Sequence, residues 1–93
     1  MNDIFIASGA RTPMGGFQGA LQGLTGVELG TVAIREAIQR SGFDPENIEE
    51  VIMGCVLPSG LKQGPARQAS IDAGIPVEVG ATTINKLCGS GMK

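Results

Sequence analysis

The sequence of 93 residues contains no histidine, no tyrosine and no tryptophan, and it has only two cysteines. A zinc site is excluded, because there is neither a histidine nor a Cys-x-x-Cys pair to bind the metal. Charge is also sparse, with 7 basic and 9 acidic residues and a formal net charge of −2. Nucleic-acid-binding proteins normally present a basic patch with stacking aromatic side chains, so this class of partner is excluded as well.

Long apolar runs and targeting signals are missing too. No run approaches the ~20 residues of a membrane span, and the N-terminus lacks the basic start of a signal peptide. Cys55 and Cys88 stand far apart, in no framework-like spacing, which fits free thiols in a reducing compartment. We therefore expect a soluble cytoplasmic protein with no membrane partner. A chain of this length buries only about 60–65% of its unfolded surface, so we expect support from oligomerisation or from further chain.

Glycine is abundant, at 15 residues, and it separates short apolar segments. Residues 3–8 are apolar and rich in strand formers, which predicts a buried strand. A long glycine-rich loop follows, up to residue 24. Thr25 and Glu28 have the spacing of a capping box, which predicts a helix that begins there, runs to Ser41 and ends at Gly42.

The second half of the chain repeats this alternation. Asp44-Pro45 indicates a turn or short helical start, and residues 51–57 form a continuous apolar run typical of a strand covered on both faces. A short helix over residues 64–73 and a third strand over residues 80–87 follow. The order β-α-β-α-β predicts an α/β fold with a parallel sheet, as in a layered α-β-α domain. Because the last turn leads into the start of another helix, we expect residues 1–93 to be an incomplete part of that domain.

The strongest chemical signal is the run Asn-Lys-Leu-Cys-Gly-Ser-Gly at residues 85–91. If a helix begins after Cys88, its N-terminus stabilises a thiolate, and the Cys88 N–H can bind an oxyanion. An ordinary buried cysteine remains the alternative, whereas a phosphate-binding loop is disfavoured because neither glycine fingerprint is present. Cys55 lies in a predicted core strand and is expected to be structural, and Arg67 either binds an anion or caps a solvated face.

Three segments of the sequence resemble the thiolase family. Residues 4–17 are similar to its opening strand and Arg-Thr-Pro turn, residues 53–69 to its second strand and helix, and residues 85–93 to its nucleophile segment. The resemblance implies that residues 1–93 are the N-terminal portion of the thiolase N-terminal domain, ending after the nucleophile turn.

The same resemblance implies an acetyl-CoA acetyltransferase, or 3-ketoacyl-CoA thiolase, in which Cys88 takes an acyl group as a thioester and its N–H is an oxyanion donor. Coenzyme A thioesters are substrates, and no cofactor or metal is implied. The family also uses a histidine, a second acid/base cysteine and an Asn-His pair, which would lie in the remainder of the thiolase chain. Residues 1–93 alone are therefore expected to be inactive, and the complete protein to be a homodimer or homotetramer.

Two alternatives stay open at this point. The chain can be a non-catalytic split subunit or relic that pairs with another chain to rebuild the fold. It can also belong to another condensing enzyme of the thiolase fold, such as a ketoacyl synthase, although the sequence around the nucleophile of those enzymes differs from residues 85–91.

Overall fold

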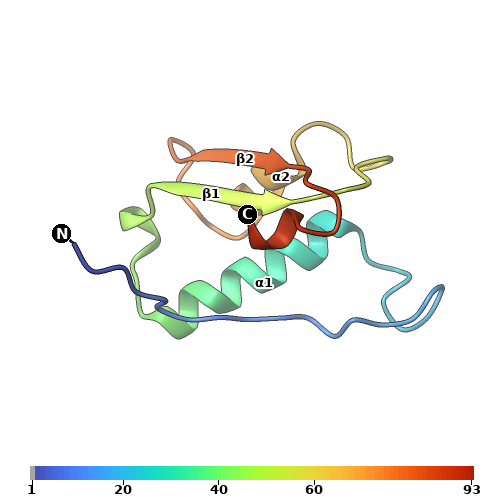
Figure 1. Cartoon of the computed structure of the whole chain (residues 1–93), viewed down its shortest axis with the longest axis horizontal. Coiled ribbons are helices and arrows are strands. Elements are labelled where there is room, and N and C mark those ends of the chain that lie inside the picture. Colours follow the sequence, from blue (N-terminus) through green and yellow to red (C-terminus); the bar gives the residue numbers. More distant parts are fainter. Residues whose placement is uncertain (1) are drawn as a thin grey trace.

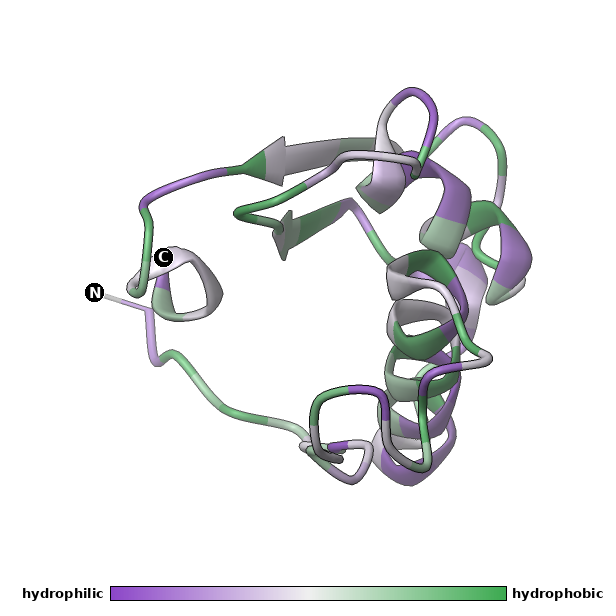
Figure 2. Ribbon diagram, turned by 90° about the vertical axis from the view of Figure 1, so that its right-hand side faces the viewer, coloured by the Kyte–Doolittle hydropathy of each residue, from purple (hydrophilic) through white to green (hydrophobic). Residues whose placement is uncertain are grey.

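The computed structural model describes residues 2–93 and has one parallel β-α-β unit at its centre. Strand β1 (Glu50–Gly54), helix α2 (Pro65–Asp72) and strand β2 (Gly80–Ile84) follow one another along the chain. The two strands pair in parallel with Glu50 opposite Gly80 and Gly54 opposite Ile84. Helices α1 (Gly26–Ser41) and α2 pack against each other (Figure 1) and lie on the same side of the two strands (Figure 2). The predicted parallel arrangement of these two strands is confirmed.

Helix α1 begins and ends where its sequence predicts. The Thr25 hydroxyl accepts a hydrogen bond from the Glu28 N–H at 3.1 Å, and the Glu28 carboxylate accepts one from the Thr25 N–H at 3.2 Å. Gly42 ends the helix in the left-handed region, with φ of 74°. The face of α1 that carries Ile34 and Ile38 then packs on the small core. That core consists of Val51, Ile75 and Val79, with Ile34, Ile38, Ile48, Met53 and Ala81 against it.

The prediction of a buried strand over residues 3–8 is wrong. The segment forms no strand, and Ile4, Phe5 and Ile6 are 95%, 82% and 94% exposed. Extended backbone becomes a strand only by pairing, and this segment lies apart from β1 and β2 and pairs with neither (Figure 2). The first of the two expected β-α-β units is consequently not formed among residues 2–93.

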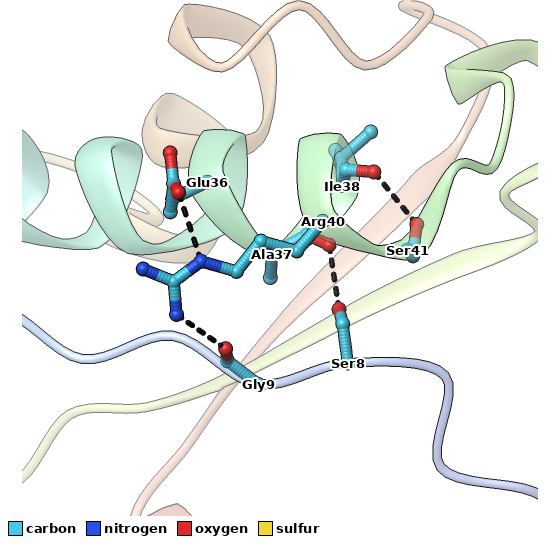
Figure 3. Close-up of polar contacts among 7 residues, drawn as sticks. All are labelled: Ser8, Gly9, Glu36, Ala37, Ile38, Arg40 and Ser41. Carbon is cyan, nitrogen blue, oxygen red and sulfur yellow. Dashed lines mark hydrogen bonds and ion pairs between the residues drawn. The ribbon is translucent and has the colours of Figure 1, made fainter.

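The N-terminal segment is instead held along α1 by polar contacts. The Ser8 hydroxyl donates to the Ala37 carbonyl oxygen at 2.6 Å, and the Arg40 guanidinium donates to the Gly9 carbonyl oxygen at 3.0 Å (Figure 3). Arg40 is also paired with Glu36 at 2.8 Å. These contacts fix the backbone near residues 8 and 9 and leave the apolar side chains before them uncovered.

The remaining elements occur in the predicted order, but both strands end earlier than the sequence predicts. Pro45–Asn47 forms a 3-10 helix, η1, capped by the Asp44 side chain, which confirms the short helical start. Strand β1 ends at Gly54, not at residue 57, and Ile52 is 52% exposed, so the expectation that both faces are covered is wrong for this position. None of the helices within residues 2–93 has the length and hydropathy that crossing a membrane requires.

Candidate functional site

Cys88 lies four residues beyond the end of β2 and is exposed. An ordinary buried position, the alternative left open by the sequence, is therefore wrong. The α-helix expected directly after Cys88 is replaced by a three-residue 3-10 helix, η2 (Ser90–Met92). A helix needs several consecutive hydrogen bonds before propagation outweighs its nucleation cost, and only the N–H groups of Met92 and Lys93 bond back within η2. Cys88 thus lies in a tight turn and not at the start of an α-helix.

The backbone of this turn reverses at Leu87, whose φ is 48°. A non-glycine residue in the left-handed region is uncommon and needs local support. That support comes from the Asn85 side chain, whose oxygen accepts the Leu87 N–H at 2.9 Å. The Gly89 and Ser90 N–H groups then donate to the Lys86 and Leu87 carbonyl oxygens, both at 3.0 Å.

Ser90 closes the same turn from its other end. Its side chain is buried, and its hydroxyl accepts the Lys86 N–H at 2.7 Å while donating to the Leu87 carbonyl oxygen, also at 2.7 Å. The sequence pattern identified Cys88 but missed Asn85 and Ser90. The signal was available, because asparagine and serine are the residues whose side chains most often bond to nearby backbone in turns.

The last residue of β1 and the two residues after it contact the turn and the end of β2 at three points. The Cys55 N–H donates to the Ile84 carbonyl oxygen at 2.9 Å, which extends the pairing beyond β1. The Asn85 amide donates to the Val56 carbonyl oxygen at 3.3 Å. Gly54 lies directly against Ser90, since a Cβ atom built at residue 54 would be 2.6 Å from the Ser90 carbonyl carbon. The turn therefore rests on the end of a neighbouring strand.

Among the hydrogen bonds of residues 2–93, none is donated by the Cys88 N–H. The Leu87 carbonyl shares a peptide group with this N–H and cannot accept from it, and the Lys86 carbonyl oxygen already accepts the Gly89 N–H. The residue thus presents both an exposed thiol and an unused backbone donor. The cysteine sulfur can attack a carbonyl carbon, and the backbone N–H can bind the oxyanion that develops from it.

Cys55 and Arg67 differ from what the sequence predicts. Cys55 follows β1 instead of lying inside it, is half-buried, and lines an apolar pocket of about 120 Å³ between the helices and β1. The Arg67 guanidinium donates to the Val79 and Val77 carbonyl oxygens at 2.9 and 2.7 Å, so it tethers the segment before β2 instead of binding an anion or capping a solvated face. No cluster of three metal-binding side chains occurs in the part of the chain that the structure describes.

A larger cleft of about 300 Å³ lies between the N-terminal segment and α1. Arg11, Arg35 and Glu36 contribute its charged groups, and no residue of the Cys88 turn lines it. Arg35 already donates to the Asp72 carbonyl oxygen at 2.7 Å, and Arg11 to the neighbouring Thr12 carbonyl oxygen at 3.1 Å. Within residues 2–93, the one exposed cysteine is therefore Cys88, which lies outside this cleft.

Known proteins match the chain throughout its length. Residues 4–93 match the family model described as "Thiolase, N-terminal domain". An acetyl-CoA acetyltransferase of Cupriavidus necator is 54% identical over 93 residues, which cover all of this chain and 24% of that protein. A cytosolic acetyl-CoA acetyltransferase of Gibberella zeae is 51% identical over 90 residues, covering 97% of this chain and 23% of that protein.

A solved structure agrees with these sequence matches. The Acat5 thiolase from Ascaris suum, crystallised in complex with coenzyme A, superposes with a TM-score of 0.95 at 46% identity, over 98% of this chain and 24% of that one. The chain spans about a quarter of the length of these relatives. The predicted resemblance and fold class are confirmed, and the chain belongs to the thiolase family.

Proposed function

We propose that the complete protein containing these residues transfers acyl groups between coenzyme A thioesters and that Cys88 is its nucleophile. The observation that carries this proposal is the exposed Cys88 on a turn with an unused N–H. Support also comes from relatives named acetyl-CoA acetyltransferase that are about half identical over the whole chain. Residues 1–93 would then be the N-terminal portion of the nucleophile-bearing domain.

The proposed reaction has two half-reactions. The Cys88 thiolate attacks the acyl carbonyl carbon of acyl-CoA, the Cys88 N–H binds the oxyanion, and the coenzyme A thiolate leaves and takes up a proton. A second acetyl-CoA then loses an α-proton to a base, and its carbanion attacks the acyl-cysteine. A carbon–carbon bond forms, the Cys88 thiolate leaves, and a 3-ketoacyl-CoA is released; the reverse direction is thiolysis.

The base and acid for these proton transfers must come from outside the Cys88 turn. The sequence has no histidine, and its only other cysteine is Cys55, which is structural. A polypeptide of residues 1–93 alone is therefore proposed to be inactive, while coenzyme A thioesters act as substrates and not as a resident cofactor. Two free thiols fit a reducing compartment such as the cytoplasm.

Substitutions at the two cysteines test the proposal in the complete protein. Cys88→Ala and Cys88→Ser are expected to abolish acyl transfer, because the serine hydroxyl stays protonated near neutral pH, while thermal stability changes little. Cys55→Ser is the matched control and is expected to keep the activity. Iodoacetamide is expected to label Cys88 faster than Cys55. Acyl transfer by either Cys88 variant, or preferential labelling of Cys55, would contradict the proposal.

A non-catalytic chain that pairs with another polypeptide is the second candidate. It is favoured by the exposed apolar side chains of Ile4, Phe5 and Ile6, which need a cover that residues 2–93 do not supply. The intact masses of all polypeptides in a denatured sample separate the two candidates. A single species several times heavier than 9.5 kDa supports the enzyme, whereas a species of 9.5 kDa with a stoichiometric companion supports the pairing chain.

A further inference from the structure

Two polar side chains brace the turn between Lys86 and Ser90, and the proposed reaction gives neither of them a role. Asn85 holds the Leu87 N–H from one end of the turn, and the Ser90 hydroxyl joins the Lys86 N–H to the Leu87 carbonyl oxygen from the other. Both interactions act on the backbone directly before Cys88. We call this pair the Asn85–Ser90 brace.

The brace sets the direction of the backbone N–H of Cys88. Leu87 at φ of 48° turns the chain so that the Gly89 and Ser90 N–H groups take the Lys86 and Leu87 carbonyl oxygens. Because the Leu87 carbonyl and the Cys88 N–H belong to one planar trans peptide group and point in opposite directions, the Ser90 hydroxyl and N–H, which donate to the Leu87 carbonyl oxygen at 2.7 and 3.0 Å, also fix the direction of the Cys88 N–H. If the brace is lost, Leu87 can relax toward negative φ, which L-residues prefer, and the Cys88 N–H then changes direction.

The brace is also tied to the sheet, so its position is fixed as well as its shape. Asn85 donates to the Val56 carbonyl oxygen at 3.3 Å, and Ser90 is only 6% exposed against the backbone of Gly54. A hydroxyl buried at this position with both of its hydrogen bonds to backbone has no free hydrogen for a substrate. Its effect on the reaction must therefore pass through the backbone of Cys88.

We propose that Asn85 and Ser90 are positioning residues that fix the Cys88 N–H as the oxyanion donor. This inference rests on the proposed function, because it concerns the acyl-transfer step at Cys88. A donor must lie within hydrogen-bond distance of the place where the oxyanion develops, and a misplacement of about 1 Å can cost on the order of 10²-fold in rate. Alkylation of the thiol forms no oxyanion and depends only on thiolate and access.

Two rates measured on the complete protein separate positioning from general structural support. The first is the acylation of Cys88 by acetyl-CoA in a single turnover, and the second is its alkylation by iodoacetamide. We expect Ser90→Ala and Asn85→Ala to lower the acylation rate at saturating acetyl-CoA by about 10- to 100-fold. We expect alkylation to stay within about threefold of the unmodified protein. Ser41→Ala is the matched control, since the Ser41 hydroxyl at the end of α1 also bridges two backbone groups: it donates to the Ile38 carbonyl oxygen (Figure 3) and accepts the Phe43 N–H.

The outcomes are distinguishable. Equal losses of acylation and alkylation in a folded variant, or acylation at the rate of the unmodified protein, overturn the positioning role alone. If Ser90→Ala does not fold, the exposed Asn85 provides the decisive variant, and an unchanged acylation rate in Asn85→Ala overturns the inference. An unmodified protein that acquires no acetyl group on Cys88 refutes the proposed function, and this inference with it.

Discussion

Replacing Gly54 with alanine adds one methyl group at the point where β1 meets the Cys88 turn. The new Cβ atom would lie 2.6 Å from the carbonyl carbon of Ser90 and 2.8 Å from its Cβ atom and its carbonyl oxygen. Contacts of this length are not tolerated, and two of the three atoms belong to backbone, so no side-chain rotation relieves them. The Ser90 backbone must therefore move.

The size of that movement sets the expected effect. Restoring an ordinary contact of 3.4 Å requires a shift of about 0.8 Å. Overpacking of this kind costs about 1–3 kcal/mol, and the reduced entropy of the unfolded chain offsets about 0.4–1 kcal/mol of it. We expect a net loss of about 1–2 kcal/mol in the free energy of unfolding. Because the displaced residue carries part of the Asn85–Ser90 brace, we also expect a fall in the acylation rate on the order of 10²-fold.

Gly80→Ala is the matched control, because Gly80 lies in the paired strand and a Cβ atom added there would meet no atom within 4 Å. We expect that variant to be neutral or stabilised by up to about 1 kcal/mol and to acylate normally. Thermal unfolding and single-turnover acylation of the complete protein measure both effects. Indistinguishable behaviour of Gly54→Ala and Gly80→Ala would refute the close approach of β1 to the turn.

Four further substitutions, at three residues, test the fold that carries this turn. Thr25→Ala removes one half of the capping box and should cost about 1 kcal/mol in urea unfolding; an unchanged midpoint would contradict the cap. Arg67→Ala loses two hydrogen bonds to backbone carbonyl oxygens and should cost about 2 kcal/mol by the same measurement. Arg67→Lys should not restore this loss, because one ammonium lacks the fork that reaches both oxygens, so full rescue would be evidence against the tether. Ser70→Ala removes a fully buried hydroxyl that has no hydrogen-bond partner among residues 2–93, and thermal unfolding should show a neutral or stabilising effect; a marked loss of stability would mean that the hydroxyl is bonded.

Sequence alone predicts the elements that are stabilised by interactions between residues close together in the chain. Helix α1 is delimited by Thr25 and Gly42, whose caps depend on neighbouring residues, and both ends were predicted correctly. The strand predicted over residues 3–8 depends on pairing with distant chain, and this segment pairs with no strand within residues 2–93. Hydrophobicity identified an apolar segment there, but it could not reveal what the segment pairs with.

The same distinction between local and long-range interactions applies to the candidate site. The glycine-rich surroundings of Cys88 indicated a reactive cysteine but left an ordinary buried one open, and the resemblance to the thiolase family favoured the nucleophile; the exposure of Cys88 agrees with a reactive role. The local hydrogen bonds of the brace could have been suggested by Asn85 and Ser90 as turn residues, but the burial of Ser90 against Gly54, 36 positions earlier in the chain, could not. Such a contact follows from the parallel register of β1 and β2, which becomes known only when the chain is folded.

The measurement that tests the central claim most directly is the mass of the cysteine peptides after the complete protein is mixed with acetyl-CoA and quenched in acid. Lys86 and Lys93 flank Cys88, so trypsin releases it on a short peptide, whereas Cys55 lies between Arg40 and Lys62. We predict the added mass of one acetyl group on the Cys88 peptide and none on the Cys55 peptide. An unmodified Cys88 peptide, or an acetyl group on Cys55 instead, would contradict the account.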